Sequence, residues 1–308
     1  MSNSTKKVIL TGADGFIGRH AIDPLRSRGF EVHAVSNIEP PDELRIEGVR
    51  WHKVDLLDNF QASNLCYEVG AGFLLHFSWY VEHGKFWDSP KNLEWVKAST
   101  ELVEQFVESG GKRAVLAGTC AEYDLSTGRI LNENSVCEPE SLYGRSKLEL
   151  FEWLEERKIS SAWGRVFFLY GPHEAPNRLV ASVIRSLLSG ETARCSHGNQ
   201  LRDFMHVKDV ASAFSALLDS DVEGAVNIAS GKAVTIKDVV NVIGVETGRP
   251  TDIDFGAFDA PENEPELVVA DVAKLRDEVE WKPMFDLEKG IRDAVDFWRN
   301  RRPHTEGQ

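Results

Sequence analysis

The chain has 308 residues, a length that corresponds to about two domains of ~150 residues each. Hydrophobic residues make up 42% and charged residues 27%, a balance typical of a globular protein whose core needs no metal or disulfide support. The 35 Lys+Arg against 49 Asp+Glu give a net charge of -14, which argues against a nucleic-acid-binding protein because phosphate binding needs a basic face.

The first half of the chain alternates short apolar runs with helical patterns. Strands are expected over 7–11, 31–36, 50–55, 72–78, 113–119 and 164–170, and helices over 16–28, 91–109 and 141–157. Such alternation is typical of a parallel sheet covered on both faces. The sequence therefore predicts an α/β fold, with a doubly wound Rossmann-type dinucleotide-binding domain over residues 1–170.

After Pro172 the pattern changes to helices separated by short strands and loops. Helices are expected over 179–189, 209–218, 236–247 and 287–299. We expect residues 171–302 to form a smaller substrate-binding lobe, partly interleaved with the first domain. Residues 303–308 are expected to be a frayed tail.

Membrane insertion and export are not expected. The most apolar stretch, 71–81, contains His76 and Ser78 and falls short of the ~20 residues that span a bilayer. The first residues show no apolar run or cleavage site typical of a signal peptide. The four cysteines are scattered without a C-x-x-C pair, which favours a reduced setting. A cytoplasmic protein is therefore expected.

Three glycines separate the first strand from the first helix. Gly12, Gly15 and Gly18 stand at G-x-x-G-x-x-G spacing, with Phe16 and Ile17 before the last. A sharp turn, the approach of a pyrophosphate and close helix–sheet packing each favour a missing side chain, and the helix N-terminus attracts an anion. An ordinary Gly-rich turn is the alternative. The position on the first strand of an alternating fold favours a dinucleotide site.

Tyr143 and Lys147 form a Y-x-x-x-K pattern on an expected helix, where residues four apart share a face. Lys147 can then lower the pKa of Tyr143 and also reach a bound ribose. A phenol activated in this way can give or take a proton at a carbonyl or alcohol. The pattern alone is common, and a solvated helix face is the alternative. It becomes specific behind a glycine loop and with Thr119 at the end of the preceding strand.

Together these features resemble the extended short-chain dehydrogenase/reductases, in particular their nucleotide-sugar epimerase, dehydratase and reductase group. The resemblance extends over nearly the whole chain. It rests on segments 11–18, 55–58, 119, 143–147, 165–172 and 202–207. It implies that Thr119, Tyr143 and Lys147 form a catalytic triad.

The resemblance also implies cofactor and substrate contacts. Asp55 and Leu56 would flank the adenine of the cofactor, and Arg202 would contact the diphosphate of a nucleotide sugar. The arginine that often precedes the C-terminal substrate segment is missing, since Ala-Pro-Glu-Asn-Glu-Pro stands at 260–265. Phosphate binding would then depend more on Arg202, with structural pairing of Arg202 to Asp203 or another acid as the alternative. Arg178 is a second candidate, or else an exposed solvated arginine.

The chain departs from the family pattern at positions that carry chemistry. The 4,6-dehydratases have Asp-Glu after the catalytic Thr as acid and base, whereas Cys120 and Ala121 stand here. The 3,5-epimerase/reductases place an acid/base cysteine two residues after the Ser/Thr. Cys120 is one residue off, which in extended backbone turns it to the other face, and a packed thiol is the alternative. Glu122 is a further candidate acid, and Phe168 replaces the usual Asn of R-x-x-N.

The end of the second strand bears on the cofactor. An NAD enzyme of this architecture usually has Asp or Glu there to hold the ribose 2′-hydroxyl, whereas this chain has Ser36 and Asn37. Both could donate to a 2′-phosphate. Arg19 could help to neutralise it, or could be a helix-surface charge, and Glu39 comes slightly too late. We expect NADP(H) to be favoured over NAD(H).

These departures favour a net reductase. The expected reaction is NADPH-dependent reduction of the 4-keto group of a nucleotide-activated 6-deoxysugar. Tyr143 would protonate the alkoxide, Thr119 would hydrogen-bond the carbonyl, and Lys147 would hold the ribose. A 4-epimerase with tightly held NAD is the first alternative, and a non-catalytic dinucleotide-sensing protein is the second.

The loop 79–83 follows the fourth strand, at the edge where ligands of such sheets bind. Trp79 and His83 could line the sugar pocket, with core or interface packing as the alternative for the aromatic side chain. The sequence shows no H-E-x-x-H or similar metal-binding spacing. A homodimer is the expected assembly.

Overall fold

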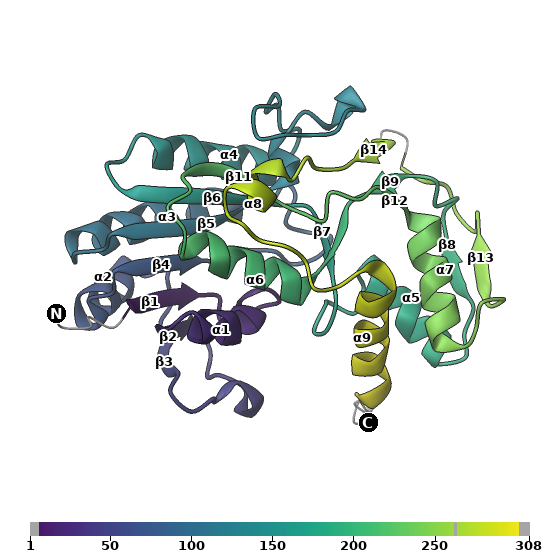
Figure 1. Cartoon of the computed structure of the whole chain (residues 1–308), viewed down its shortest axis with the longest axis horizontal. Helices are drawn as coiled ribbons and strands as arrows, with labels where there is room; N and C mark the ends of the chain where they lie inside the picture. Colours follow the sequence, from purple (N-terminus) through teal and green to yellow (C-terminus); the bar gives the residue numbers. More distant parts are fainter. Residues whose placement is uncertain (1–5, 262–263, 302–308) are drawn as a thin grey trace.

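Seven parallel strands form the central sheet of the structure, a computed structural model that describes residues 6–261 and 264–301. Their spatial order is β11-β6-β5-β4-β1-β2-β3 (Figure 1). They are β1 (Lys6–Thr11), β2 (Phe30–Ser36), β3 (Arg50–Lys53), β4 (Phe73–His76), β5 (Arg113–Thr119), β6 (Ser160–Val166) and β11 (Gly224–Ile228). The Rossmann-like parallel sheet predicted from the alternating pattern is confirmed. The tail expected at 303–308 lies outside the described residues.

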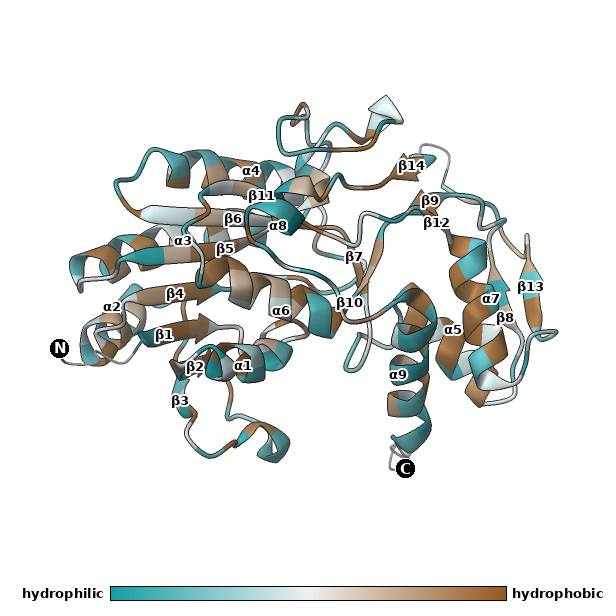
Figure 2. Cartoon of the chain, viewed as in Figure 1, coloured by the Kyte–Doolittle hydropathy of each residue, from teal (hydrophilic) through white to brown (hydrophobic). Residues whose placement is uncertain are grey.

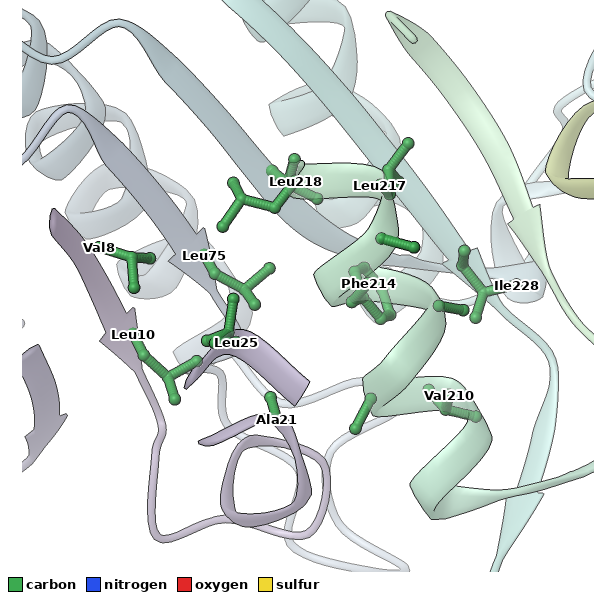
Figure 3. Packing of buried hydrophobic residues seen from close by; sticks show 14 of the residues in the cluster. Val8, Leu10, Ala21, Leu25, Leu75, Val210, Phe214, Leu217, Leu218 and Ile228 are labelled. Carbon is green, nitrogen blue, oxygen red and sulfur yellow. The ribbon is translucent and has the colours of Figure 1, made fainter. Parts of the chain in front are cut away.

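Five helices cover the two faces of this sheet. They are α1 (Gly18–Ser27), α2 (Asn59–Val69), α3 (Lys91–Glu108), α4 (Leu142–Glu155) and α6 (Val207–Leu218). Successive side chains of a strand point to opposite faces. Val8 and Leu10 of β1 therefore pack with α1 and α6 (Figure 3), whereas Ile9 packs with α2 and α3 on the other face. The hydrophobic colour of β1, β4 and β5 in Figure 2 reflects this double burial.

Three helices pack together beyond the carboxyl ends of the strands (Figure 1), namely α5 (Leu179–Leu188), α7 (Ile236–Thr247) and α9 (Leu287–Asn300). The other short elements are β7 (Phe168–Tyr170), β8 (Ala193–Cys195), β9 (Leu201–Arg202), β10 (Phe204–His206), β12 (Val234–Thr235), β13 (Ile253–Phe255), β14 (Leu267–Val268) and α8 (Ala273–Asp277). Because α6 and β11 belong to the main sheet and its cover, the second half of the chain contributes to both units. Across 6–261 and 264–301, no helix is long and apolar enough to cross a membrane.

The single strand expected over 164–170 is wrong. β6 pairs with β5 and β11 up to Val166, and β7 then leaves the sheet to pair with β10. The switch occurs at Phe167, whose N–H still donates to Ile228 at 3.3 Å, while the N–H of Phe168 donates to Asp203 at 3.2 Å. The segment is apolar on both sides of this switch, so hydrophobicity alone does not reveal the change of pairing partner. The helix expected over 16–28 begins at Gly18.

Candidate active site

A cleft of about 770 Å³ opens at the carboxyl ends of the central strands and is closed on its far side by residues of α5 and α7. Most of the residues singled out from the sequence line this one cleft. They are Gly12, Gly15, Phe16, Ile17, Gly18, Ser36, Asn37, Asp55, Leu56, Trp79, His83, Thr119, Tyr143, Lys147, Arg178 and Arg202. Segments far apart in the sequence are thus brought to a single site.

The glycine loop makes a cradle that side chains would fill. Gly12 has a φ of 62°, and a Cβ there would lie 3.0 Å from the backbone nitrogen of Ser78. A Cβ on Gly18 would overlap the carbonyl oxygen of Gly12. Helix α1 follows with Ile17 as its N-cap, an apolar residue that cannot satisfy the first backbone N–H groups. This geometry fits the pyrophosphate of a dinucleotide.

Lys147 projects from α4 into the cleft wall. Its Nζ donates to the carbonyl oxygen of Ala117 at 2.7 Å and lies 3.7 Å from the ring centroid of Trp79. Burial lowers the pKa of Lys147 to about 7. The indole Nε1 of Trp79 donates to Asn92 at 2.8 Å, which fixes the ring. The edge of the Trp79 ring is therefore fixed in the core by Asn92, and the face of the ring positions the Lys147 ammonium.

Tyr143 lies on the same face of α4 and packs edge-to-face against the rings of Phe86 and Trp87, at centroid distances of 4.9 and 5.8 Å. Burial raises the pKa of Tyr143, and a hydrogen bond with Thr119 acts in the opposite direction. The expected lowering of this pKa by Lys147 is not observed, because the ammonium is directed to Ala117 and Trp79. The phenol is therefore held in its protonated form.

A buried ion pair between Glu122 and Arg165 holds the backbone of Thr119. Glu122 accepts a hydrogen bond from the Thr119 N–H at 2.7 Å and pairs with Arg165 Nε at 2.7 Å. Its side chain is fully buried and does not line the cleft, so Glu122 is not placed to act as an acid on a substrate. Residues 120–122 form a 3-10 turn rather than extended backbone, and Cys120 lines the cleft. Burial raises the pKa of the Cys120 thiol to about 12.

The two arginines that line the cleft, Arg178 and Arg202, differ in their surroundings. Arg202 is buried and pairs through Nη2 with Glu264 at 2.8 Å, not with the adjacent Asp203. Asp203 accepts hydrogen bonds from Ser230 and neighbouring backbone instead. Arg178 is half-buried at the N-cap of α5. A bound diphosphate would therefore compete with Glu264 for Arg202 but would meet Arg178 directly.

The structure does not bring every candidate into the cleft. Arg19 is absent from its lining because Nε and Nη2 donate to the Asp14 carbonyl at 3.2 and 3.1 Å and Nη1 contacts the His173 ring. Glu39 is exposed and pairs with Arg45 and Lys53, each at 3.7 Å. Ser36 and Asn37 thus remain the side chains at the end of β2. The described residues contain no cluster of His, Cys, Asp and Glu suited to a metal ion.

Glu174 is a cleft residue that the sequence analysis missed. It follows the Tyr-Gly-Pro segment, and its side chain is only 4% exposed. Burial raises the pKa of its carboxyl to about 8. The sequence does show an acidic residue in the loop after β7. It does not show that this loop folds into the cleft.

Comparisons with known proteins identify the family of the chain. Residues 8–229 match the NAD dependent epimerase/dehydratase family. The chain is 25% identical to the UDP-glucose 4-epimerase of Rhizobium meliloti, over 96% of this chain and 97% of that protein. It is 24% identical to the CDP-abequose synthase of Salmonella typhimurium, over 94% of this chain and 97% of that one. Among solved structures, MoeE5 in complex with UDP-glucuronic acid and NAD gives a TM-score of 0.81 at 28% identity, covering 95% and 99% of the two chains.

Proposed function

The chain belongs to the NAD-dependent epimerase/dehydratase family, and from that premise we propose that it reduces the 4-keto group of a nucleotide-activated 6-deoxysugar with NADPH. One observation carries the proposal. A single cleft joins the glycine loop, the three catalytic candidates Thr119, Tyr143 and Lys147, and two arginines. Cofactor, proton donor and anionic substrate would thus meet at one place.

The cofactor would lie along the carboxyl edge of the sheet. Gly12, Gly15 and Gly18 would hold the pyrophosphate, and Asp55 and Leu56 would flank the adenine. Ser36 and Asn37 present no carboxylate to a 2′-phosphate, which supports NADP(H) over NAD(H). The NAD in the MoeE5 complex supports a nicotinamide dinucleotide of either kind.

The protein would supply the proton and the alignment. A bound reduced nicotinamide would supply the hydride to the carbonyl carbon. Tyr143 would give its phenolic proton to the carbonyl oxygen and recover one from solvent, while Thr119 would hydrogen-bond that oxygen. A reduction needs the protonated phenol, and burial favours this form of Tyr143. Lys147, fixed by Ala117 and Trp79, would hold the ribose.

The substrate side combines two cations with apolar walls. A net charge of -14 repels anions at long range, so Arg178 and Arg202 would capture the diphosphate locally. Phe168 and Phe204 line the same region, and the Phe168 ring lies 5.4 Å from the Arg202 guanidinium. Such a wall suits a sugar that lacks a hydroxyl. His83 is an exposed residue at the rim and a further candidate contact.

A 4-epimerase with tightly held NAD is the second candidate, supported by the named activity of the Rhizobium relative. A dinucleotide sensor is a third, but it would have no use for Thr119, Tyr143 and Lys147 together. We also propose a homodimer in the cytoplasm. Two measurements separate these functions.

The first measurement identifies the dinucleotide released from the purified, denatured protein. The second follows the absorbance of NADPH with a panel of nucleotide-activated 4-keto-6-deoxysugars. A reductase consumes NADPH with one of them and carries no stoichiometric NAD. If the protein carries bound NAD and interconverts UDP-hexoses, the assignment changes from reductase to epimerase. If no hydride transfer occurs with any substrate, the dinucleotide sensor is the remaining hypothesis.

A further inference from the structure

Glu174 lines the reaction cleft and has one carboxyl oxygen without a hydrogen-bond partner in the part of the chain that the structure describes. It lies on the loop between β7 and α5, and its side chain lines the cleft at 4% exposure. Within the described residues, Oε2 is buried and has no hydrogen-bond partner. Four other buried side-chain atoms share this property, on Ser146, Gln200, His206 and Trp298, but none of these residues lines the cleft.

Arg178 connects Glu174 electrostatically with the catalytic phenol. The cation that acts on its carboxyl is Arg178, four residues along the chain at the N-cap of α5. The backbone N–H groups of Gly171 and Ala181 also act on it. Arg178 in turn acts on Tyr143. Glu174, Arg178 and Tyr143 therefore line the same cleft and are coupled through the charge of Arg178.

A buried carboxyl oxygen without a partner destabilises the folded chain. A ligand that supplies the missing partner removes this penalty, so the position is explained if a bound molecule contacts Oε2. Phosphate oxygens and a sugar carboxylate are acceptors with negative charge, which the ionised form of the carboxyl repels. A hydroxyl suits either protonation state of the carboxyl, because it both donates and accepts.

We propose that Glu174 is a specificity residue that hydrogen-bonds a ring hydroxyl of the sugar. The inference rests on the proposed function, since it takes the sugar of a nucleotide sugar as the ligand. Arg178 is then shared between the diphosphate and the carboxyl of Glu174. The residue selects substrates with that hydroxyl in place over deoxygenated or carboxylated analogues.

The test compares Glu174→Leu and Glu174→Gln with the wild type. Titration calorimetry with NADP+ present measures binding of UDP-glucose, dTDP-glucose and their deoxy analogues, and a separate titration measures NADP+ itself. A melting curve is recorded for each protein. Asp209→Asn is the control, because Asp209 is buried outside the cleft with its oxygens bonded to Met284 and Phe285.

Glu174→Leu should weaken sugar-nucleotide binding ~10- to 100-fold, the size of a hydrogen bond to an ionisable group. It should leave NADP+ affinity within about twofold and raise the melting temperature, whereas Asp209→Asn should lower the melting temperature without affecting binding. Glu174→Gln should lose less, because the amide keeps donor and acceptor. One deoxy analogue should bind the wild type more weakly and bind Glu174→Leu as well as its parent.

Four results would overturn the inference. If wild type and Glu174→Leu bind the sugar nucleotide with equal affinity, the proposed contact does not exist, while the proposed function is unaffected. Weaker NADP+ binding alone would assign Glu174 to the cofactor. A lower melting temperature with both ligands weakened alike would make the role structural. A wild type that binds no nucleotide sugar would overturn the proposed function as well.

Discussion

Glu174 gives the folded chain a distinctive dependence of stability on pH. Burial raises the pKa of its carboxyl from 4.5 to about 8. Between these values the folded chain keeps a proton that the unfolded chain has released, so folding becomes less favourable as pH rises. The penalty is absent below the unfolded-state pKa, where both states are protonated. It is complete above the folded-state pKa.

The size of this penalty follows from the two pKa values. Each pKa unit corresponds to about 1.4 kcal/mol, so the full difference is ~5 kcal/mol, of which ~4 kcal/mol falls between about pH 5 and about pH 9. Glu174→Gln removes the titration. The stability of the variant relative to the wild type should therefore increase by ~4 kcal/mol over this range. This corresponds to ~8 °C in melting temperature at ~2 °C per kcal/mol for a chain of this length.

The assay is thermal or urea unfolding of both proteins without ligand, at about pH 5, 7 and 9. The difference between wild type and variant cancels the titration of His20, His173 and the other groups that the proteins share. Glu191→Gln is the matched control, since Glu191 is an exposed glutamate and its variant should follow the wild-type curve. Parallel stability curves for wild type and Glu174→Gln would refute the reasoning, because they would show a carboxyl that ionises in the folded state without penalty.

Three further substitutions test the proposed roles. Tyr143→Phe should keep cofactor affinity and lower kcat by ~10²–10⁴ in steady-state assays, which is the range for a positioned acid. Full activity of this variant would show that Tyr143 is not the proton donor. Asn37→Asp should reverse a preference for NADP(H) over NAD(H) in fluorescence titrations by placing a carboxylate beside the 2′-phosphate, and an unchanged order would separate this residue from the preference. Arg202→Met should raise KM for the nucleotide sugar more than tenfold with NADP(H) affinity unchanged. A fall in melting temperature with constant KM would instead limit Arg202 to its ion pair with Glu264.

Local signals made the glycine loop and the Tyr143–Lys147 pair of the cleft predictable. The spacing of Gly12, Gly15 and Gly18 encodes a backbone shape, since a side chain at Gly18 would overlap the loop itself. Tyr143 and Lys147 share a helix face by periodicity alone. Each of these features lies within a few residues of sequence, so no knowledge of long-range packing was needed to find it.

Features that depend on long-range packing were not predictable. Arg19 stands next to the glycine loop in sequence, yet the chain returns with His173 beside it and directs the guanidinium away from the cleft. Glu264 neutralises Arg202 across 62 residues. The departure of β7 from the sheet after Phe167 is decided by the competing backbone partners Ile228 and Asp203, and this departure carries Glu174 into the site.

Helix α2 shows a different limit. Its N-terminal signal was present, because the Asp58 side chain accepts hydrogen bonds from the N–H groups of Phe60 and Gln61. Phe60 and Tyr67 are exposed, however, so the apolar residues of this helix do not mark one buried face. A capping residue without a clear amphipathic pattern was insufficient for a prediction.

The most direct test of the account is the fate of the hydride in the wild-type protein. The protein is incubated with NADPH deuterated at C4 of the nicotinamide and with a nucleotide-activated 4-keto-6-deoxysugar, and the product is examined by mass spectrometry and NMR. The account predicts one deuterium at C4 of the sugar, NADP+ in equal amount, and loss of this transfer in Tyr143→Phe. A sugar that turns over without deuterium at C4, or no transfer to any 4-keto substrate, would contradict it.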